Sequence, residues 1–100
     1  MRSQAEKEFA RWLDARGFEP PSFNEPFGPF TLDAIWPAAR LAVEIDTYET
    51  HGTRDSFEAD RLRDAYTASH GLRTIRVTPR RWRDDGDRLE RDLRRALSRA

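Results

Sequence analysis

The sequence contains no cysteine, a single lysine and no long apolar run. Without cysteine the chain can form neither disulfides nor thiolate zinc sites. Its apolar runs fall far short of the roughly 20 residues that span a bilayer. The N-terminal stretch MRSQAEKEFARWL is too charged for a signal peptide. These absences predict a cytoplasmic protein with no membrane segment.

Charge is balanced overall but unevenly distributed along the chain. The 18 basic and 18 acidic residues give a formal net charge of zero. Residues 1–71 carry 8 basic and 13 acidic side chains, whereas residues 72–100 carry 10 basic and 5 acidic ones. An acidic body with a basic C-terminal third suits a metal site beside a phosphate-binding surface. The alternative is an ordinary charged surface, in which the 17 arginines reflect coding bias.

One hundred residues are enough for one domain, 1–100, which is either self-sufficient or one piece of a longer protein. Hydrophobic periodicity predicts the order α-β-β-β-α-β-α, an α/β fold in which helices pack against one sheet. The expected elements are a helix from residue 3 to about 17, strands at 22–27, 30–36, 41–46 and 72–78, a helix at 55–70 and a final helix at 87–97. A turn is expected at 84–86, and no element is assigned to 79–83.

The hydrophobic pattern also predicts how Trp82 and the helix at 55–70 pack. Trp82 can either stack on a nucleic-acid base or lie in the core against the last helix, and we expect the core position. The helix at 55–70 is expected to pack on the sheet through a face that carries Leu62, Ala65, Tyr66 and Ser69. The remaining surface of this helix would then be charged, with Asp60, Arg61 and Arg63.

The second and third strands should form a hairpin whose register can be counted from its turn. Side chains alternate between the faces of a strand, so Asp33 and Leu32 should lie on opposite faces. Pairing Trp36 with Leu41 across the turn sets Asp33 directly opposite Glu44. The Cβ atoms of such cross-strand neighbours lie roughly 5 Å apart.

Alternation also places Asp33, Glu44 and Asp46 on one face of these two strands. Acidic residues are disfavoured in strands, and adjacent carboxylates repel each other. A divalent cation is the simplest compensation, because Mg²⁺ takes hard oxygen ligands and can activate water for phosphodiester hydrolysis. The pattern therefore predicts a metal site at these three residues. The alternative is the polar, solvent-facing side of a half-exposed sheet.

The run Ser3-Gln4-Ala5-Glu6 has the signature of a capping box at the start of the first helix. Glu6 is then expected to bond back to the backbone of Ser3, which is a structural role. The alternative is that Glu6 contributes to the metal site. The sequence alone leaves both roles open.

Five arginines lie close together after the middle of the chain with no acid among them, and Trp82 lies between the last two. Guanidinium groups can hold phosphates bidentately, which predicts contact with the DNA backbone. The alternative is that the arginines are merely solvated. The five are Arg73, Arg76, Arg80, Arg81 and Arg83, and DNA contact is assigned to the last four.

An ordered set of short motifs resembles the PD-(D/E)xK nuclease superfamily. The run VEIDTYETHGTRDSFEADRLRD resembles in particular the small endonuclease-like domains related to very-short-patch repair endonucleases. No single motif is specific, but the resemblance spans residues 3 to about 83. The motifs are Ser3 with Glu6, Asp33, Val43-Glu44-Ile45-Asp46, His51-Gly52, and Asp60 with Arg63-Asp64.

This resemblance implies a restriction-endonuclease-like three-layer core, αβββαβ(α), with a mixed four-stranded sheet. It also implies a metal-dependent DNA endonuclease that uses Mg²⁺ or Mn²⁺. Asp33 and Glu44 would bind the metal, and Asp46 would be a third ligand or would orient water. His51 would act as a general acid and base near the scissile phosphate.

Two departures from the superfamily pattern leave other functions open. The superfamily's lysine is absent, Asp46 stands in its place, and Lys7 is the only lysine in the chain. Thr47 replaces the glycine that follows the acid, which changes the loop before His51. The alternatives are a catalytically inactive module that binds DNA or protein, attached to a DNA-binding domain, or a homodimerisation domain.

Overall fold

The computed structural model describes residues 3–47 and 54–99, which contain the predicted elements in the predicted order. None of the described helices combines the length and the apolar character needed to cross a membrane. One short helix, α3, was not predicted, and its Pro79 occupies a first-turn position that suits proline. The elements are α1 (Gln4–Ala15), β1 (Ser22–Phe27), β2 (Phe30–Trp36), β3 (Leu41–Ile45), α2 (Arg54–Ser69), β4 (Arg73–Val77), α3 (Pro79–Asp84) and α4 (Gly86–Leu97).

The strands form a mixed four-stranded sheet in the order β1-β2-β3-β4. The pairs β1–β2 and β2–β3 are antiparallel, and β3–β4 is parallel, because α2 carries the chain back between them. Trp36 pairs with Leu41, which confirms the predicted hairpin register. Since β3 and β4 run in the same direction, their carboxyl ends meet at one edge of the sheet. There the Asp46 N–H donates a hydrogen bond of 2.9 Å to the Val77 carbonyl oxygen.

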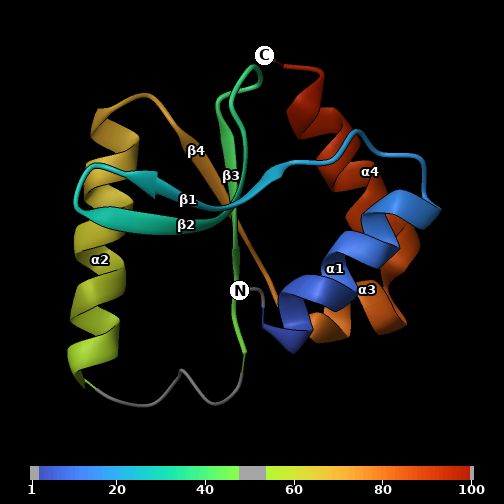
Figure 1. Cartoon of the computed structure of the whole chain (residues 1–100), viewed down its shortest axis with the longest axis horizontal. Helices are drawn as coiled ribbons and strands as arrows, with labels where there is room; N and C mark the ends of the chain where they lie inside the picture. Colours follow the sequence, from blue (N-terminus) through green and yellow to red (C-terminus); the bar gives the residue numbers. More distant parts are fainter. Residues whose placement is uncertain (1–2, 48–53, 100) are drawn as a thin grey trace.

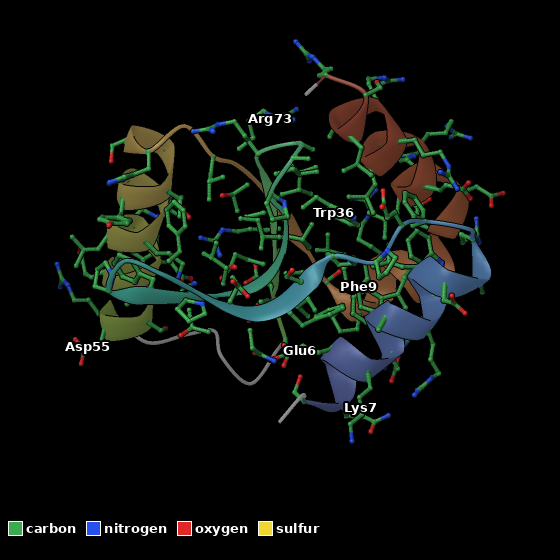
Figure 2. All side chains as sticks on the ribbon, turned by 45° about the horizontal axis from the view of Figure 1, so that its top comes forward. Glu6, Lys7, Phe9, Trp36, Asp55 and Arg73 are labelled. Atoms are coloured by element: carbon green, nitrogen blue, oxygen red, sulfur yellow. The ribbon has the colours of Figure 1, made fainter. Side chains whose placement is uncertain are left out.

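Helices cover both faces of the sheet, with α2 on one side and α1, α3 and α4 on the other (Figure 1). The main core lies on the side of α1, α3 and α4, and Figure 2 shows Phe9 and Trp36 within it. Trp82 is also buried there, with its ring centroid 5.2 Å from that of Phe9, which confirms its predicted core position. The buried members of this core are Phe9, Leu13, Phe18, Ala34, Trp36, Ala39, Leu41, Val43, Val77, Trp82, Leu89 and Leu93.

The face of the sheet that α2 covers has only a small apolar core, made of Leu32, Ile35, Ala42 and Leu72 with Phe27 against it. Leu32 therefore does not share a core with Ala34, and the simple alternation predicted for β2 fails. The neighbouring strand has a kink at the same level, because Asn24 between Phe23 and Glu25 has φ +53°. Asparagine is one of the few residues that tolerate this left-handed backbone.

The predicted packing face of α2 was wrong except at Tyr66, which packs against the aromatic residues beside the turn between β1 and β2. Leu62 is 67% exposed, and Thr67 is the buried residue of the described helix. Arg63 and Asp64, expected at the surface or left unassigned, are partly buried. The helix packs through polar groups because its neighbours on the sheet are carboxylates.

Because the core around α4 is apolar and the outer side of α2 is in water, truncating a leucine to alanine should affect stability very differently in the two helices. Leu93→Ala in α4 should lower the free energy of unfolding by about 2–5 kcal/mol, because it leaves a cavity at a fully buried position. Leu62→Ala on α2 should change it by less than about 0.5 kcal/mol, since the side chain is mostly in water. Urea unfolding followed by circular dichroism measures both. A loss of stability in Leu62→Ala comparable to that in Leu93→Ala would contradict the described orientation of α2.

Candidate active site

Two carboxylates interlock where β2 and β3 move apart. The hydrogen-bonded ladder between these strands runs from Trp36–Leu41 to Ala34–Val43. Beyond it, the Asp33 N–H donates to Glu44 Oε2 at 3.1 Å, and the Ile45 N–H donates to Asp33 Oδ2 at 2.7 Å. Each side chain thus takes a backbone donor of the opposite strand. Asp33 and Glu44 are therefore neighbours, as predicted, but the described ladder ends before them and they do not share one face of the sheet.

Burial makes this pair costly to ionise. The side chain of Glu44 is only 4% exposed. Its removal from water, followed by repulsion from the Asp33 carboxylate, raises the pKa of Glu44 to about 7. Burial also raises the pKa of Asp33, although the hydrogen bond from the Ile45 N–H opposes the shift. Nearby positive charge would therefore stabilise the ionised pair.

Helix α2 supplies positive charge beside Glu44 through Arg63. Arg63 Nη1 lies 2.8 Å from Glu44 Oε1 and 3.6 Å from Asp60 Oδ1. Both oxygens of Glu44 are consequently engaged, one by Arg63 and one by the Asp33 backbone. The residue thus lies on the α2 side of the sheet, locked in place.

Arg76 of β4 extends the same charged cluster. Its Nη2 lies 2.6 Å from Asp64 Oδ1, and its Nη1 lies 3.5 Å from Asp46 Oδ1 and 3.8 Å from Asp60 Oδ2. Although the sequence assigned Arg76 to DNA contact, the structure places it among these acids with its side chain 26% exposed.

Sequence reasoning missed the role of α2, although a signal was present. Asp60, Arg63, Asp64 and Thr67 follow one another at spacings of three, one and three residues, which puts them on one helix face. This face was read as solvent-exposed because it is polar. This polar face nevertheless meets the sheet, because the sheet presents acidic side chains to it.

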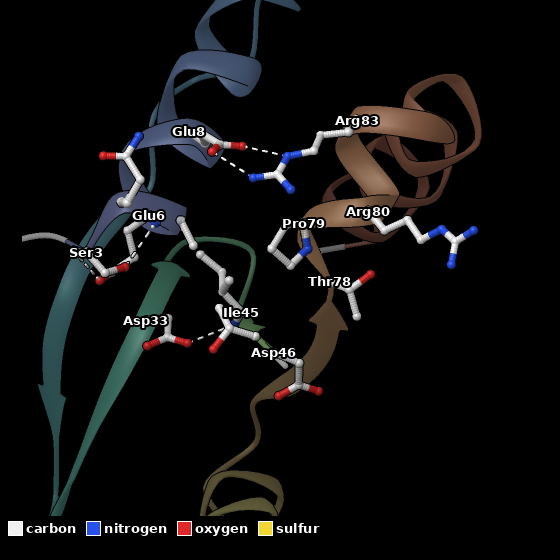
Figure 3. A pocket seen from close by; sticks show the side chains of 13 residues that line it. Ser3, Glu6, Glu8, Asp33, Ile45, Asp46, Thr78, Pro79, Arg80 and Arg83 are labelled. Carbon is white, nitrogen blue, oxygen red and sulfur yellow. Dashed lines mark hydrogen bonds and ion pairs between the residues drawn. The ribbon is translucent and has the colours of Figure 1, made fainter. Parts of the chain in front are cut away.

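A cleft of about 880 Å³ lies next to Asp33, on the side of the sheet where α1 and α3 pack. Figure 3 shows how it is bounded by the start of α1, the middle of β2 at Asp33, the end of β3, and the junction of β4 with α3. Asp33, Asp46 and Glu6 contribute carboxylates to its lining, whereas Glu44 is not among the described lining residues. The lining residues are Ser3, Gln4, Ala5, Glu6, Glu8, Asp33, Ile45, Asp46, Thr47, Thr78, Pro79, Arg80 and Arg83.

Glu6 has both of the features that the sequence left open. The predicted capping box is present: the Ser3 N–H donates to Glu6 Oε1 at 3.0 Å, and the Glu6 N–H donates to Ser3 Oγ at 3.2 Å. The second oxygen, Oε2, is buried and has no hydrogen-bond partner among the described residues. Glu6 is only 7% exposed, so this oxygen is an unpaired acceptor at the cleft.

Of the arginines predicted to contact DNA, Arg80 and Arg83 line the cleft, whereas Arg81 is not among its described lining residues. Arg83 pairs with Glu8 at 2.7 Å, and Arg81 pairs with Asp92 at 3.2 Å, so both are engaged within the protein. The side chain of Arg80 lines the cleft and is 87% exposed. His51 lies outside the residues that the structure describes.

The donor chemistry of the cleft fits a hard divalent cation. Glu6 offers a buried oxygen without a partner, and the Asp33 and Asp46 carboxylates line the same cleft. Oxygen ligands of this kind suit Mg²⁺ or Mn²⁺. Within residues 3–47 and 54–99, however, no three acidic or histidine side chains already converge as a metal-binding group. Metal binding would therefore require some of these side chains to rearrange.

No protein-family model matches this chain, and a search of curated proteins found no match. Among solved structures, the chain is similar to one described as "Homing Endonuclease I-Bth0305I Catalytic Domain". The two share 12% sequence identity over 96% of this chain and 95% of that one, with a TM-score of 0.74. The chain thus has a nuclease-like α/β fold.

The raised pKa of Glu44 predicts a stability that depends on pH. The folded protein keeps a proton on Glu44 between pH 4.5 and about 7 that the unfolded chain has released, so this group makes folding less favourable as pH rises through that range. Glu44→Gln removes the effect. Relative to the parent, Glu44→Gln should therefore gain up to about 3 kcal/mol of unfolding free energy as the pH rises from 4 to 8.

Urea unfolding at several pH values measures this difference. Glu58→Gln, at an exposed position on the same helix as Arg63, serves as the control and should leave the profile unchanged. A flat difference between Glu44→Gln and the parent would show that Glu44 is ionised throughout, and the explanation from burial would be wrong.

Proposed function

We propose that this chain is a metal-dependent DNA endonuclease of the PD-(D/E)xK superfamily, from the branch related to very-short-patch repair endonucleases. The observation that carries the proposal is the interlocked pair of Asp33 and Glu44 beside a carboxylate-lined cleft. Its position supports a catalytic use, because ligands of α/β proteins bind outside the carboxyl ends of parallel strands. The nuclease-like fold is consistent with the same function.

The acidic residues would divide two tasks between them. Asp33 and Asp46 line the cleft and would hold Mg²⁺ or Mn²⁺, and the buried, unpaired oxygen of Glu6 would join them as a ligand. When bound, such an ion activates water and offsets the charge that develops on the phosphate. Glu44 fixes the Asp33 backbone through its hydrogen bond, and it would join the metal ligands only if Arg63 released it.

A cation at the cleft would replace the superfamily's lysine in contacting phosphate. Lys7 is exposed on α1 and is not among the described lining residues. Arg80 lines the cleft at the start of α3, and within the described part of the chain its one ion pair is a 3.5 Å contact with Asp84. We therefore assign the phosphate at the cleft to Arg80. His51 follows Asp46 by five residues in the sequence and keeps its proposed role as general acid and base.

Asp33→Asn should lower the rate of plasmid cleavage by roughly two orders of magnitude in Mg²⁺ or Mn²⁺. Asparagine retains an oxygen that can accept the Ile45 N–H, so the hairpin should remain folded while the charge is lost. The assay follows the conversion of supercoiled plasmid to nicked and linear forms, with an EDTA control. The matched control is Asp14→Asn, which changes an exposed acid on α1 and should cleave like the parent.

Absence of cleavage by the folded parent with either metal would contradict the proposal. It would favour the second candidate, a DNA-binding module with the same fold and no catalysis. The engagement of both Glu44 oxygens and the missing lysine are the observations that favour this candidate.

Substitutions at the capping box should separate the two roles of Glu6. Glu6→Gln preserves the box, since glutamine also serves at this position, and should keep the unfolding free energy within about 0.5 kcal/mol. It should nevertheless raise the Mn²⁺ concentration needed for half-maximal cleavage. Ser3→Ala should do the reverse, lowering stability by about 1 kcal/mol and leaving the Mn²⁺ requirement unchanged. Equal Mn²⁺ requirements for Glu6→Gln and the parent would leave Glu6 with a capping role only.

A further inference from the structure

The outer face of α4 carries a row of arginines. Their spacing of three, four and four residues places them along one side of the helix, with the last just beyond its end. All four are exposed, whereas Leu89 and Leu93 on the inner side are fully buried. The arginine row consists of Arg88, Arg91, Arg95 and Arg99.

The acids of α4 are already neutralised by other arginines. Arg16 lies 2.9 Å from both Asp87 and Glu90, and Arg94 lies 2.9 Å from Glu90. These contacts run along the flank of α4 that faces α1. On the opposite flank, Asp92 pairs with Arg81 of α3 at 3.2 Å.

The arginine row itself lacks comparable partners. Arg91, Arg95 and Arg99 form no ion pair with any residue in the described part of the chain, and Arg88 comes no closer than 3.9 Å to Asp85. Because the acids of the helix are occupied elsewhere, the charge of the row is left uncompensated on this face. This differs from Arg76, Arg81 and Arg83, whose charges are satisfied internally.

We propose that the arginine row binds the phosphate backbone of duplex DNA, as a contact surface additional to the cleft. Arg88 and Arg99 are eleven positions apart, a length of about 16 Å if the helical rise of about 1.5 Å per residue extends just past the end of α4. Duplex DNA advances roughly 3.4 Å along its axis per base pair, so the row spans about five base pairs and can reach several phosphates. Guanidinium groups suit this partner because they bind phosphate oxygens bidentately.

The position of α4 would let one duplex use both surfaces. The helix follows α3, which begins at the cleft with Pro79 and Arg80, and runs from there towards the C-terminus (Figure 1). The row therefore extends the basic surface away from the cleft. Backbone contacts of this kind position a protein on DNA without reading its sequence. The choice of DNA as the partner rests on the proposed function.

Salt dependence of binding tests the row directly. The protein would be titrated into a short fluorescent duplex of arbitrary sequence, in EDTA to prevent cleavage, between roughly 50 and 200 mM salt. Arg91→Gln/Arg95→Gln should reduce the slope of log affinity against log salt by about 1.8, since each lost phosphate contact removes about 0.9. The control Arg11→Gln/Arg61→Gln changes two exposed arginines on other helices and should leave the slope unchanged.

Three results would overturn the row as a DNA contact. Equal losses in both double variants would show an effect of net charge alone, and unchanged slopes in both would show no contact. Binding to vesicles of anionic lipid, with no binding to duplex DNA, would indicate a different partner.

Because binding is measured without metal, it is independent of the catalytic proposal. Binding that depends on the row, from a parent that does not cleave, would refute catalysis and support the row. Cleavage together with unchanged binding by Arg91→Gln/Arg95→Gln would refute only the row.

Discussion

The reciprocal hydrogen bonds of Asp33 and Glu44 are the constraint on which the rest of this structure depends. Each carboxylate accepts a backbone N–H from the opposite strand at the point where β2 and β3 move apart. The backbone of the two strands thus fixes Asp33 Oδ2 and Glu44 Oε2, and Arg63 of α2 holds the other oxygen of Glu44. It also buries negative charge, which is unfavourable unless cations lie nearby. The surrounding elements supply positive charge on one side of the pair and leave an open cleft on the other.

Helix α2 shows the structural consequence. Its inner face carries Arg63, which reaches Glu44, so the helix has few apolar contacts with the sheet. The hairpin of β1 and β2 adds a contact at its tip, where Gly28 has φ +58° and lies against Tyr66. A Cβ atom at Gly28 would come within 2.7 Å of the Tyr66 ring, so only glycine allows this approach. The α2 layer is thus held by ion pairs and by the contacts of Tyr66 with Phe27 and Phe30 more than by an aliphatic core.

The arginines divide into two groups with different tasks. Those that point towards the sheet or between helices, such as Arg63 and Arg76, neutralise buried or half-buried acids. Those at the cleft rim and along α4, such as Arg80 and Arg95, remain in solvent with little or no compensation. A chain with no net charge can therefore still present a locally positive surface, because several of its acids are paired with arginines elsewhere in the fold.

The sequence by itself determined the α/β order, the Trp36–Leu41 register, the Ser3–Glu6 capping box and hence the meeting of Asp33 with Glu44, because these follow from local periodicity and counting along neighbouring strands. It could not determine which side of α2 would face the sheet, because ion pairs between distant residues outweighed the apolar pattern of the helix. For the same reason, the sequence did not show which of several neighbouring arginines would form ion pairs with acids. Only the tertiary structure brought Arg76 to Asp64, left Arg91, Arg95 and Arg99 without an ion pair among the described residues, and left the second oxygen of Glu6 buried without a partner. Each of these depends on elements that approach one another only when the chain is folded.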